Sequence, residues 1–303
     1  MPLDPDLAGL LQLVQAGTPM AELTPVEARE SFRKLTEIVK ADADPVRVAS
    51  VEPVRVPGAV GDLHARVYRP EVEGPCPTVV FFHGGGFVIG DLDTHDRMAR
   101  TLCHRTESVV VSVGYRLAPE DPFPAAAEDA VASTRWIQSH LEEFGGDPRL
   151  AVAGDSAGGN LAAVATQQVP ALTAQLLIYP ATDGAQGEHG SRTENGEGYL
   201  LDRATLAWFM DHYRPRDEDV RFSPLRGSLA GLPPAVVATA EFDPLRDEGE
   251  AYAAALREAG VEVVLRRYDG MIHGFMDLGP AAPAAQTATD DAIDEFGRLL
   301  RAH

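Results

Sequence analysis

Cysteine and basic side chains are scarce in this chain of 303 residues. The two cysteines, Cys76 and Cys103, form neither a disulfide framework nor a metal-ligand spacing, so no metal site is expected. Lysine and arginine total 26 against 46 acidic residues, which gives a formal net charge of -20. This charge argues against nucleic acids and anionic membranes as partners, and it would repel anionic substrates at long range.

Long apolar runs are also missing. No segment approaches the length that spans a bilayer, and no basic region followed by an apolar run marks a signal peptide. We therefore expect no stable membrane insertion and a cytoplasmic location. The P-loop Lys-Ser/Thr and the G-x-G-x-x-G frame are absent as well, and we expect no cofactor.

The pattern of apolar residues predicts an α/β fold. Two amphipathic helices are expected in the first 45 residues, followed by a hairpin of residues 46–56 and 62–69. From Thr78 onward, buried strands alternate with helices, which indicates a mostly parallel central sheet with helices on both faces. The expected strands are 78–82, 108–113, about 151–155, 175–179, 235–240 and 262–268, and the expected helices are 94–106, about 124–144, 246–259 and 285–301. No linker divides the chain, so residues 1–303 are expected to form a single domain.

One segment interrupts the alternation of strands and helices. Residues 184–198 are polar, rich in glycine and too long for an ordinary connection, and a helix with Asp202 as its N-cap follows them. We expect residues 1–45 and 184–222 to form a helical cap over the active site, although an ordinary surface excursion is the alternative. Three apolar side chains of this helix are candidates to line a substrate pocket, namely Trp208, Phe209 and Met210.

The sequence Gly154-Asp155-Ser156-Ala157-Gly158 joins an expected strand to an expected helix. A turn this sharp brings the residues around the serine into near contact, so that glycine is needed on both sides. The serine is then held in a strained conformation with its hydroxyl clear of the sheet. Ser156 is a candidate nucleophile if a base, an acid and an oxyanion hole lie nearby.

The loop His83-Gly84-Gly85-Gly86 follows a buried strand. Consecutive glycines let backbone N–H groups approach a substrate oxygen closely, as stabilisation of an oxyanion requires. We expect Gly84 and Gly85 to donate to the oxyanion together with the N–H of Ala157.

Three carboxylates follow the strand that ends at Ala240, and each could orient the base: Glu241, Asp243 and Asp247. Asp243 is preferred because it lies in the loop proper, where Pro244 holds its backbone extended. Glu241 and Asp247 are interpreted as solvated or capping carboxylates.

Among the nine histidines, His273 follows the last strand and gives the order Ser156, Asp243, His273. His83 is the rival for the base, but its place before the glycines favours a role in anchoring the loop. His189, in the polar segment, is expected to be solvated.

These motifs, together with Tyr115-Arg116-Leu117-Ala118-Pro119-Glu120, resemble the hormone-sensitive lipase family of α/β-hydrolase carboxylesterases. The resemblance runs from about Val60 to the end of the chain. It implies the α/β-hydrolase fold with a helical cap, and Ser156, His273 and Asp243 as nucleophile, base and acid. It also implies Gly84, Gly85 and Ala157 as oxyanion donors.

The expected function is hydrolysis of short- to medium-chain carboxylic esters through an acyl-enzyme. Hydrolysis of amides, carbamates or lactones by the same residues is one alternative, and a non-catalytic receptor that binds a small ligand is another. The last expected strand, 262–268, is a candidate edge for a homodimer.

Overall fold

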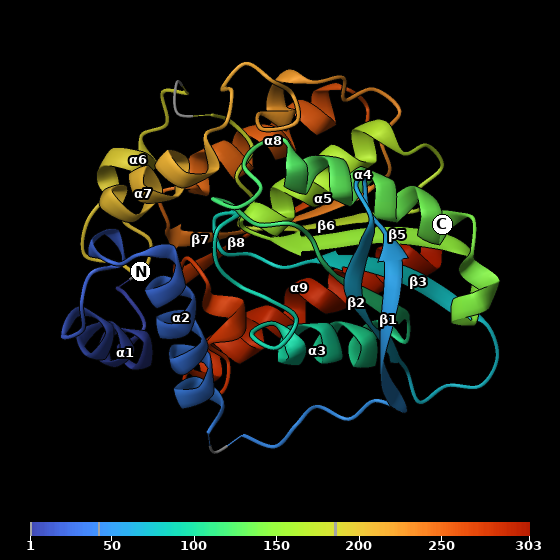
Figure 1. Ribbon diagram of the computed structural model, residues 1–303, viewed down its shortest axis with the longest axis horizontal. Coiled ribbons are helices and arrows are strands. Elements are labelled where there is room, and N and C mark those ends of the chain that lie inside the picture. Colours follow the sequence, from blue (N-terminus) through green and yellow to red (C-terminus); the bar gives the residue numbers. More distant parts are fainter. Residues whose placement is uncertain (1, 42, 185–186) are drawn as a thin grey trace.

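The computed structural model describes residues 2–41, 43–184 and 187–303. Its centre is an eight-stranded sheet in the order β1-β2-β4-β3-β5-β6-β7-β8 (Figure 1). Strands β1 and β2 form the expected antiparallel hairpin, β2 pairs antiparallel with β4, and the pairs from β4 to β8 are parallel. The strands are β1 (Ser50–Pro57), β2 (Asp62–Arg69), β3 (Cys76–Phe82), β4 (Val109–Gly114), β5 (Gly146–Asp155), β6 (Gln175–Ile178), β7 (Ala235–Phe242) and β8 (Val263–Ile272).

Helices cover both faces of this sheet, as the alternating pattern predicts. Figure 1 shows α4, α5 and α8 on one side of the strands and α3 and α9 on the other. The α-helices are α1 (Pro5–Gln15), α2 (Pro25–Lys40), α3 (Asp96–Thr106), α4 (Ala125–Gln138), α5 (Ala157–Gln168), α6 (Ser191–Glu194), α7 (Arg203–Tyr213), α8 (Arg246–Glu258) and α9 (Pro283–Ala302). Short 3-10 helices are η1 (Met20–Glu22), η2 (Leu141–Phe144), η3 (Pro224–Arg226) and η4 (Phe275–Asp277).

The apolar runs of the central strands supply two separate cores, because neighbouring residues of a strand point to opposite faces. In β3, Val80 and Phe82 pack into one core, whereas Val79 and Phe81 pack into the other. All four side chains are fully buried. A strand that is apolar at every position is therefore the form expected for a sheet covered on both sides.

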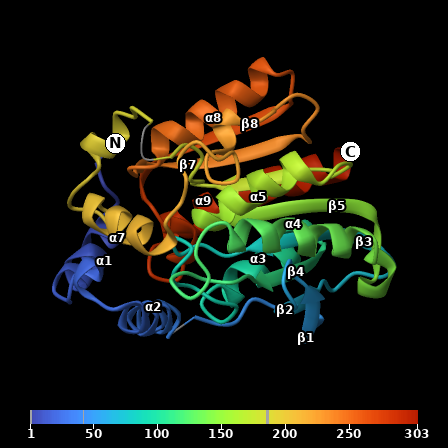
Figure 2. The ribbon, with the colours of Figure 1, turned by 45° about the horizontal axis from the view of Figure 1, so that its top comes forward.

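The N-terminal helices lie beside α7, far away in the sequence (Figures 1 and 2). Helix α2 begins with a capping box, in which the Thr24 N–H donates to Glu27 Oε2 at 2.9 Å. The indole N–H of Trp208 in α7 donates to the Leu23 carbonyl at 3.1 Å, just before α2. The Gln15 side chain donates to the Gly198 carbonyl at 3.1 Å. These contacts join the two segments that the sequence identified as cap candidates.

Several expected elements differ from the structure. Strand β5 begins at Gly146 instead of about residue 151, and β8 continues to Ile272 instead of ending at residue 268. Helix α4 ends at Gln138, and the predicted continuation to about residue 144 is instead the 3-10 helix η2. Gly145 ends η2 with a φ of 78°, so β5 begins at once with Gly146. The predicted loop 184–198 contains the short helix α6. Residues 185–186 of this loop lie outside the described residues, and so do Met1 and residue 42 of the expected N-terminal cap segment.

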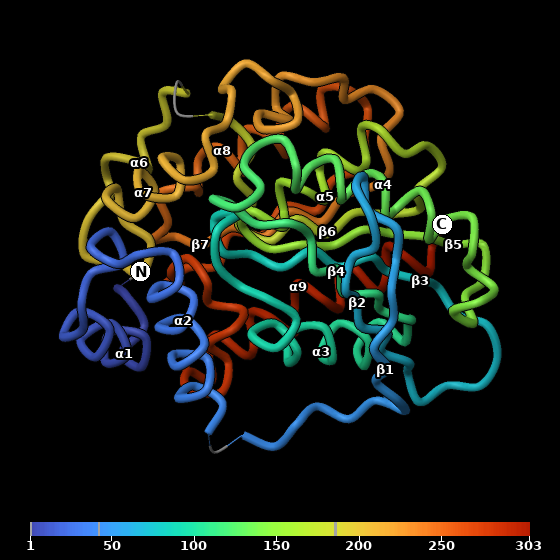
Figure 3. The backbone as a smooth tube through the Cα atoms, viewed as in Figure 1, coloured from blue at the N-terminus to red at the C-terminus, as the bar shows by residue number. Residues whose placement is uncertain are grey.

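The backbone trace shows how residues 43–49 run in an irregular path from the end of α2 to the outer strand β1 (Figure 3). At the opposite edge of the sheet lies β8, the expected edge strand. Among the described helices, none is long and apolar enough to cross a membrane.

Candidate active site

The serine turn joins β5 to α5. Ser156 has φ 54° and ψ -116°, the strained conformation expected at this corner. A Cβ on Gly158 would lie 1.9 Å from the Phe82 carbonyl oxygen, and one on Gly154 would lie 2.2 Å from the Gly158 oxygen. The close approach of β3, β5 and α5 therefore requires glycine at both positions, as the sequence pattern predicts.

Three side chains from three different loops form a chain of hydrogen bonds. The Ser156 Oγ lies 2.9 Å from His273 Nε2, and His273 Nδ1 lies 2.7 Å from Asp243 Oδ2. Because a carboxylate only accepts, Nδ1 carries the proton and Nε2 is free to accept from the serine hydroxyl. Asp243 is fully buried and His273 is 8% exposed. The arrangement can move a proton away from Ser156.

Asp243 is held by its own loop and by the segment before α7. Its Oδ1 accepts the Leu245 N–H at 2.8 Å, and its carbonyl accepts from the Asn195 side chain at 3.2 Å. The two other candidate carboxylates bind backbone elsewhere. Glu241 accepts the Gly270 N–H at 2.7 Å, and Asp247 accepts the Ser191 N–H at 2.7 Å. Among the described contacts, Asp243 is the one carboxylate of these three that lies within hydrogen-bond distance of His273.

The glycine loop requires a correction to the predicted donors. The Gly84 N–H donates to Asp155 Oδ1 at 2.8 Å, so it is already engaged by a buried carboxylate and is not free for a substrate. In the described part of the chain, no hydrogen bond uses the N–H of Gly85, Gly86 or Ala157. The sequence could not separate these amides, because which N–H Asp155 binds depends on the fold.

His83, the rival for the base, lies in the wall of the loop. It is 1% exposed, and its Nδ1 lies 2.8 Å from the Gly84 carbonyl oxygen, to which it donates. The Tyr115 hydroxyl donates to the His83 carbonyl at 2.7 Å. Burial and the neighbouring His95 lower the pKa of His83 to about 4. A neutral, buried imidazole fits the predicted anchoring of the loop.

The three apolar candidates on α7 have different surroundings. The ring of Phe209 lies against the glycine loop, since a Cβ on Gly86 would meet its Cγ at 2.3 Å. Trp208 is turned toward Leu23 and joins α7 to the N-terminal segment. Met210 is partly buried against the core. Phe209 is thus the candidate that contacts the loop beside the serine.

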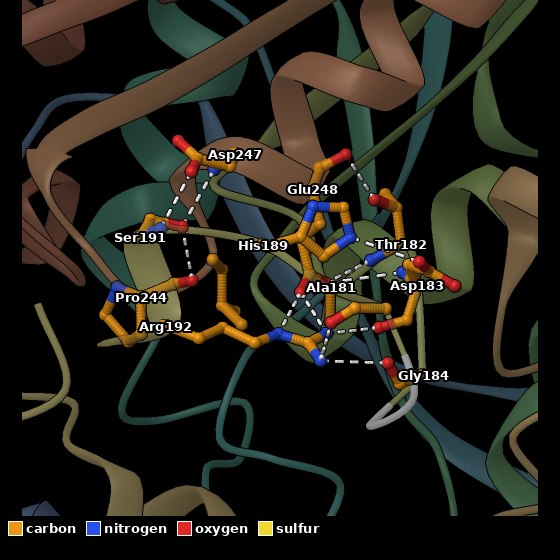
Figure 4. Close-up of polar contacts among 12 residues, drawn as sticks. Ala181, Thr182, Asp183, Gly184, His189, Ser191, Arg192, Pro244, Asp247 and Glu248 are labelled. Atoms are coloured by element: carbon orange, nitrogen blue, oxygen red, sulfur yellow. Dashed lines mark hydrogen bonds and ion pairs between the residues drawn. The ribbon is translucent and has the colours of Figure 1, made fainter. Parts of the chain in front are cut away.

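The insertion, defined as residues 184–198, is fastened to the start of α8 (Figure 4). Figure 4 shows Arg192 reaching Glu248, with 2.5 Å between Nη2 and Oε2, while Glu248 is only 1% exposed. The Ser191 hydroxyl donates to the Pro244 carbonyl at 2.8 Å. The expected solvation of His189 is wrong, because its Nε2 lies 3.1 Å from Asp183 and its side chain is 12% exposed. The Ser191 contact thus fastens the insertion to the loop that carries Asp243.

Among the residues that the structure describes, one group of histidine and aspartate side chains is close enough together to be considered as a metal site. Donor atoms of His95, Asp155 and Asp277 lie within 4.8 Å of one another. One oxygen of Asp155 is engaged by Gly84, and the imidazole sits between the two carboxylates. We interpret the group as a cluster of mutually compensating charges. No sequence pattern indicated His95 or Asp277.

Comparison with known proteins identifies the family. Residues 79–277 match a family model described as an alpha/beta hydrolase fold. The carboxylic ester hydrolase LipN of Mycobacterium tuberculosis is 44% identical over 92% of this chain and 76% of its own length. The ethyl acetate hydrolase of Pseudomonas putida is 42% identical over 92% of this chain and 93% of its own.

Solved structures agree with this match. A hyperthermophilic esterase from Pyrobaculum calidifontis superimposes with a TM-score of 0.93 at 39% identity, over 100% of this chain and 99% of the other. The similarity thus covers the cap candidates as well as the sheet. The chain belongs to the hormone-sensitive lipase family of carboxylesterases in the α/β-hydrolase superfamily.

Proposed function

We propose that this protein hydrolyses short- to medium-chain carboxylic esters by two-step acyl transfer. The observation that carries the proposal is the hydrogen-bonded chain Ser156–His273–Asp243, with spacings of 2.9 and 2.7 Å. In the first step, His273 Nε2 takes the hydroxyl proton while Ser156 Oγ bonds to the ester carbonyl carbon. Asp243 holds the imidazole tautomer and stabilises its charged form.

The tetrahedral intermediate carries a negative oxygen, and backbone amides must hold it. The donors that we assign are Gly85, Gly86 and Ala157, whose N–H groups make no other hydrogen bond among the described residues. Gly84 is replaced in this role because its N–H binds Asp155. When the intermediate collapses, the bond to the leaving oxygen breaks and His273 gives its proton to the departing alcohol.

Water completes the cycle. His273 accepts a proton from a water molecule as the water oxygen bonds to the acyl carbon, again through a tetrahedral oxyanion. The bond to Ser156 Oγ then breaks, the proton returns to the serine, and the carboxylic acid leaves. Loss of one oxyanion donor costs about 3 kcal/mol in the barrier at such sites.

Two observations support a preference for esters with short acyl chains. Phe209 fills the space directly over Gly86 and so limits the room beside the serine. The ethyl acetate hydrolase among the relatives acts, by its name, on a very small ester. Helices α1, α2 and α7 together form the proposed cap: the Trp208–Leu23 hydrogen bond joins α7 to the start of α2, and the Gln15–Gly198 hydrogen bond joins α1 to the insertion.

The experiment is Ser156→Ala, assayed on p-nitrophenyl acetate, butanoate and octanoate. We expect turnover to fall by about 10⁴-fold or more while the circular dichroism spectrum is unchanged. Retained turnover in the variant would overturn the mechanism. Parallel assays of matched amides, carbamates and lactones separate the alternative substrates, and a native protein that hydrolyses none of them would support the receptor alternative.

A further inference from the structure

A buried cluster of three ionisable side chains lies behind the serine turn, outside the proposed proton path. His95 Nε2 lies 3.6 Å from Asp155 Oδ2 and 3.7 Å from Asp277 Oδ2. The His95 and Asp155 side chains are 2% and 5% exposed, and that of Asp277 is 16% exposed. Charged groups this deeply buried are costly unless they compensate one another.

Each carboxylate of the cluster is attached to a part of the proposed machinery. Asp155 directly precedes Ser156, and its Oδ1 accepts the Gly84 N–H at 2.8 Å. Asp277 lies in η4, where its N–H donates to the Gly274 carbonyl at 3.1 Å, one residue after His273. The cluster thus links the glycine loop, the nucleophile turn and the histidine loop.

The surroundings of the two ring nitrogens of His95 fit a doubly protonated ring. The Thr94 hydroxyl donates to the Asp91 carbonyl at 2.9 Å, so its oxygen is left to accept from His95 Nδ1, which lies 2.9 Å away. With Nδ1 bound in this way, Nε2 faces the two carboxylates. An imidazolium donates from Nδ1 to Thr94 and places its Nε2–H at ion-pair distance from both carboxylates.

Three charged groups from three elements act on His95, and the neutral ring of His83 lies nearby. Asp155 of β5 and Asp277 of η4 attract the imidazolium, Lys40 of α2 opposes it, and the His83 ring lies 5.3 Å away. Burial by itself lowers the pKa of His95, but the two carboxylates outweigh burial and raise it to about 9. His83 stays neutral because burial and His95 lower its pKa to about 4.

We propose that His95 is a positioning residue for ester hydrolysis: its imidazolium holds the Asp155 carboxylate in place, and Asp155 fixes Gly84 and with it the oxyanion amides that follow. This inference rests on the proposed function. His95 touches neither the substrate nor the reacting atoms, and it acts through the glycine loop.

Loss of the imidazolium charge removes the positive partner that the two carboxylates share, and it does so behind a site where negative charge develops. Both the loop geometry and the electrostatics then disfavour the oxyanion. We expect kcat to fall as pH rises through about 9 in the native protein, with KM little changed because the substrate meets no member of the cluster.

The test compares three variants. His95→Gln removes the charge, Asp277→Asn removes one attracting carboxylate, and His104→Gln is the matched control, since His104 is an exposed histidine on the adjoining helix α3. We expect His95→Gln to lower kcat by about 10- to 100-fold and to abolish the alkaline limb. Asp277→Asn should move that limb to lower pH, because His95 keeps only one carboxylate. The control should match the native protein in both respects.

A native kcat that stays flat from pH 8 to 10.5 overturns the proposal, as does a folded His95→Gln protein within twofold of native kcat. If His95→Gln does not fold, the pH profiles of the native protein and Asp277→Asn decide: an unmoved limb in the latter overturns the proposal. Stoichiometric labelling of Ser156 by a phosphonate tests the proposed function separately, so the two can fail independently.

Discussion

Asp155 and Ser156 are adjacent residues that point into different surroundings. The Asp155 carboxylate faces inward, where it meets Gly84 and His95, whereas the Ser156 hydroxyl faces His273. The positive φ of Ser156 makes this divergence possible, because it reverses the direction of the chain between the strand and the helix. The strained backbone of Ser156 thus directs the nucleophile toward His273 and away from the charged cluster.

Phe209 is the residue whose substitution should alter chain-length preference. In Phe209→Leu the space over Gly86 enlarges, and we expect kcat/KM for p-nitrophenyl octanoate relative to butanoate to rise about tenfold. Steady-state rates on the two esters measure the ratio. Phe144→Leu is the control, since Phe144 lies in η2 at the opposite end of β5 from Ser156. An equal change of the ratio in both variants would contradict a role for Phe209 in the pocket.

At the residue scale, the sequence identified the side chains that the fold brings together but not all of their contacts. Ser156, Asp243 and His273 follow strand ends, and the carboxyl ends of parallel strands share one edge of the sheet. Gly84 was misassigned because neighbouring glycine amides point in directions that only the Asp155 contact fixes. His95 carries no local signal, since a histidine before a helix is common and its partners come from β5 and η4.

At the scale of elements, the insertion supports the loop that carries Asp243. Helix α6 spans only Ser191–Glu194, yet Ser191 and Arg192 bind Pro244, Asp247 and Glu248 around it (Figure 4). The length and glycine content of residues 184–198 predict from the sequence that this segment is an insertion. Its attachment to α8 could not be predicted, because Arg192 and Glu248 lie 56 residues apart in the sequence and neither belongs to a motif that the sequence analysis identifies.

The ion pair between α6 and α8 gives a stability prediction. Arg192→Met leaves the buried Glu248 carboxylate uncompensated, and we expect the free energy of unfolding to fall by about 3 kcal/mol. Urea denaturation measures the change. Lys34→Met is the control, because Lys34 and its partner Glu30 are 65% and 62% exposed and loss of this pair should cost less than about 1 kcal/mol. Similar losses in the two variants would contradict a structural role for the Arg192–Glu248 pair.

At the scale of the whole molecule, β8 is an edge strand that pairs only with β7 among the described strands, and the Asp4 N–H occupies its Gly270 carbonyl near the end of the strand. An unpaired strand edge is a template for pairing with a second copy, and we propose a homodimer through β8. Static light scattering should give twice the 32.4 kDa of one chain. A mass of one chain at every concentration tested would contradict the dimer. The expected cytoplasmic location stays a prediction.

The whole fold was the most predictable feature of the chain. Apolar strands that alternate with helices dictate a covered parallel sheet, and the two extended runs 46–56 and 62–69 predict the hairpin β1–β2. The ends of elements are harder to predict. Helix α4 ends at Gln138, and the chain continues as the separate 3-10 helix η2 instead of lengthening α4. The packing of α1, α2 and α7 against one another depends on side-chain contacts between distant segments, and the apolar periodicity of each single helix does not predict these contacts.

The central claim is that Ser156 is activated by His273, and covalent labelling tests it most directly. The native protein is treated with a fluorophosphonate ester and its intact mass is measured, with Ser156→Ala and His273→Gln treated in parallel. We predict one adduct per native chain, located on Ser156 by peptide mapping, none on Ser156→Ala, and labelling slowed by at least about 10³-fold in His273→Gln. A native protein that takes up no label, or labels at another residue, would contradict the account.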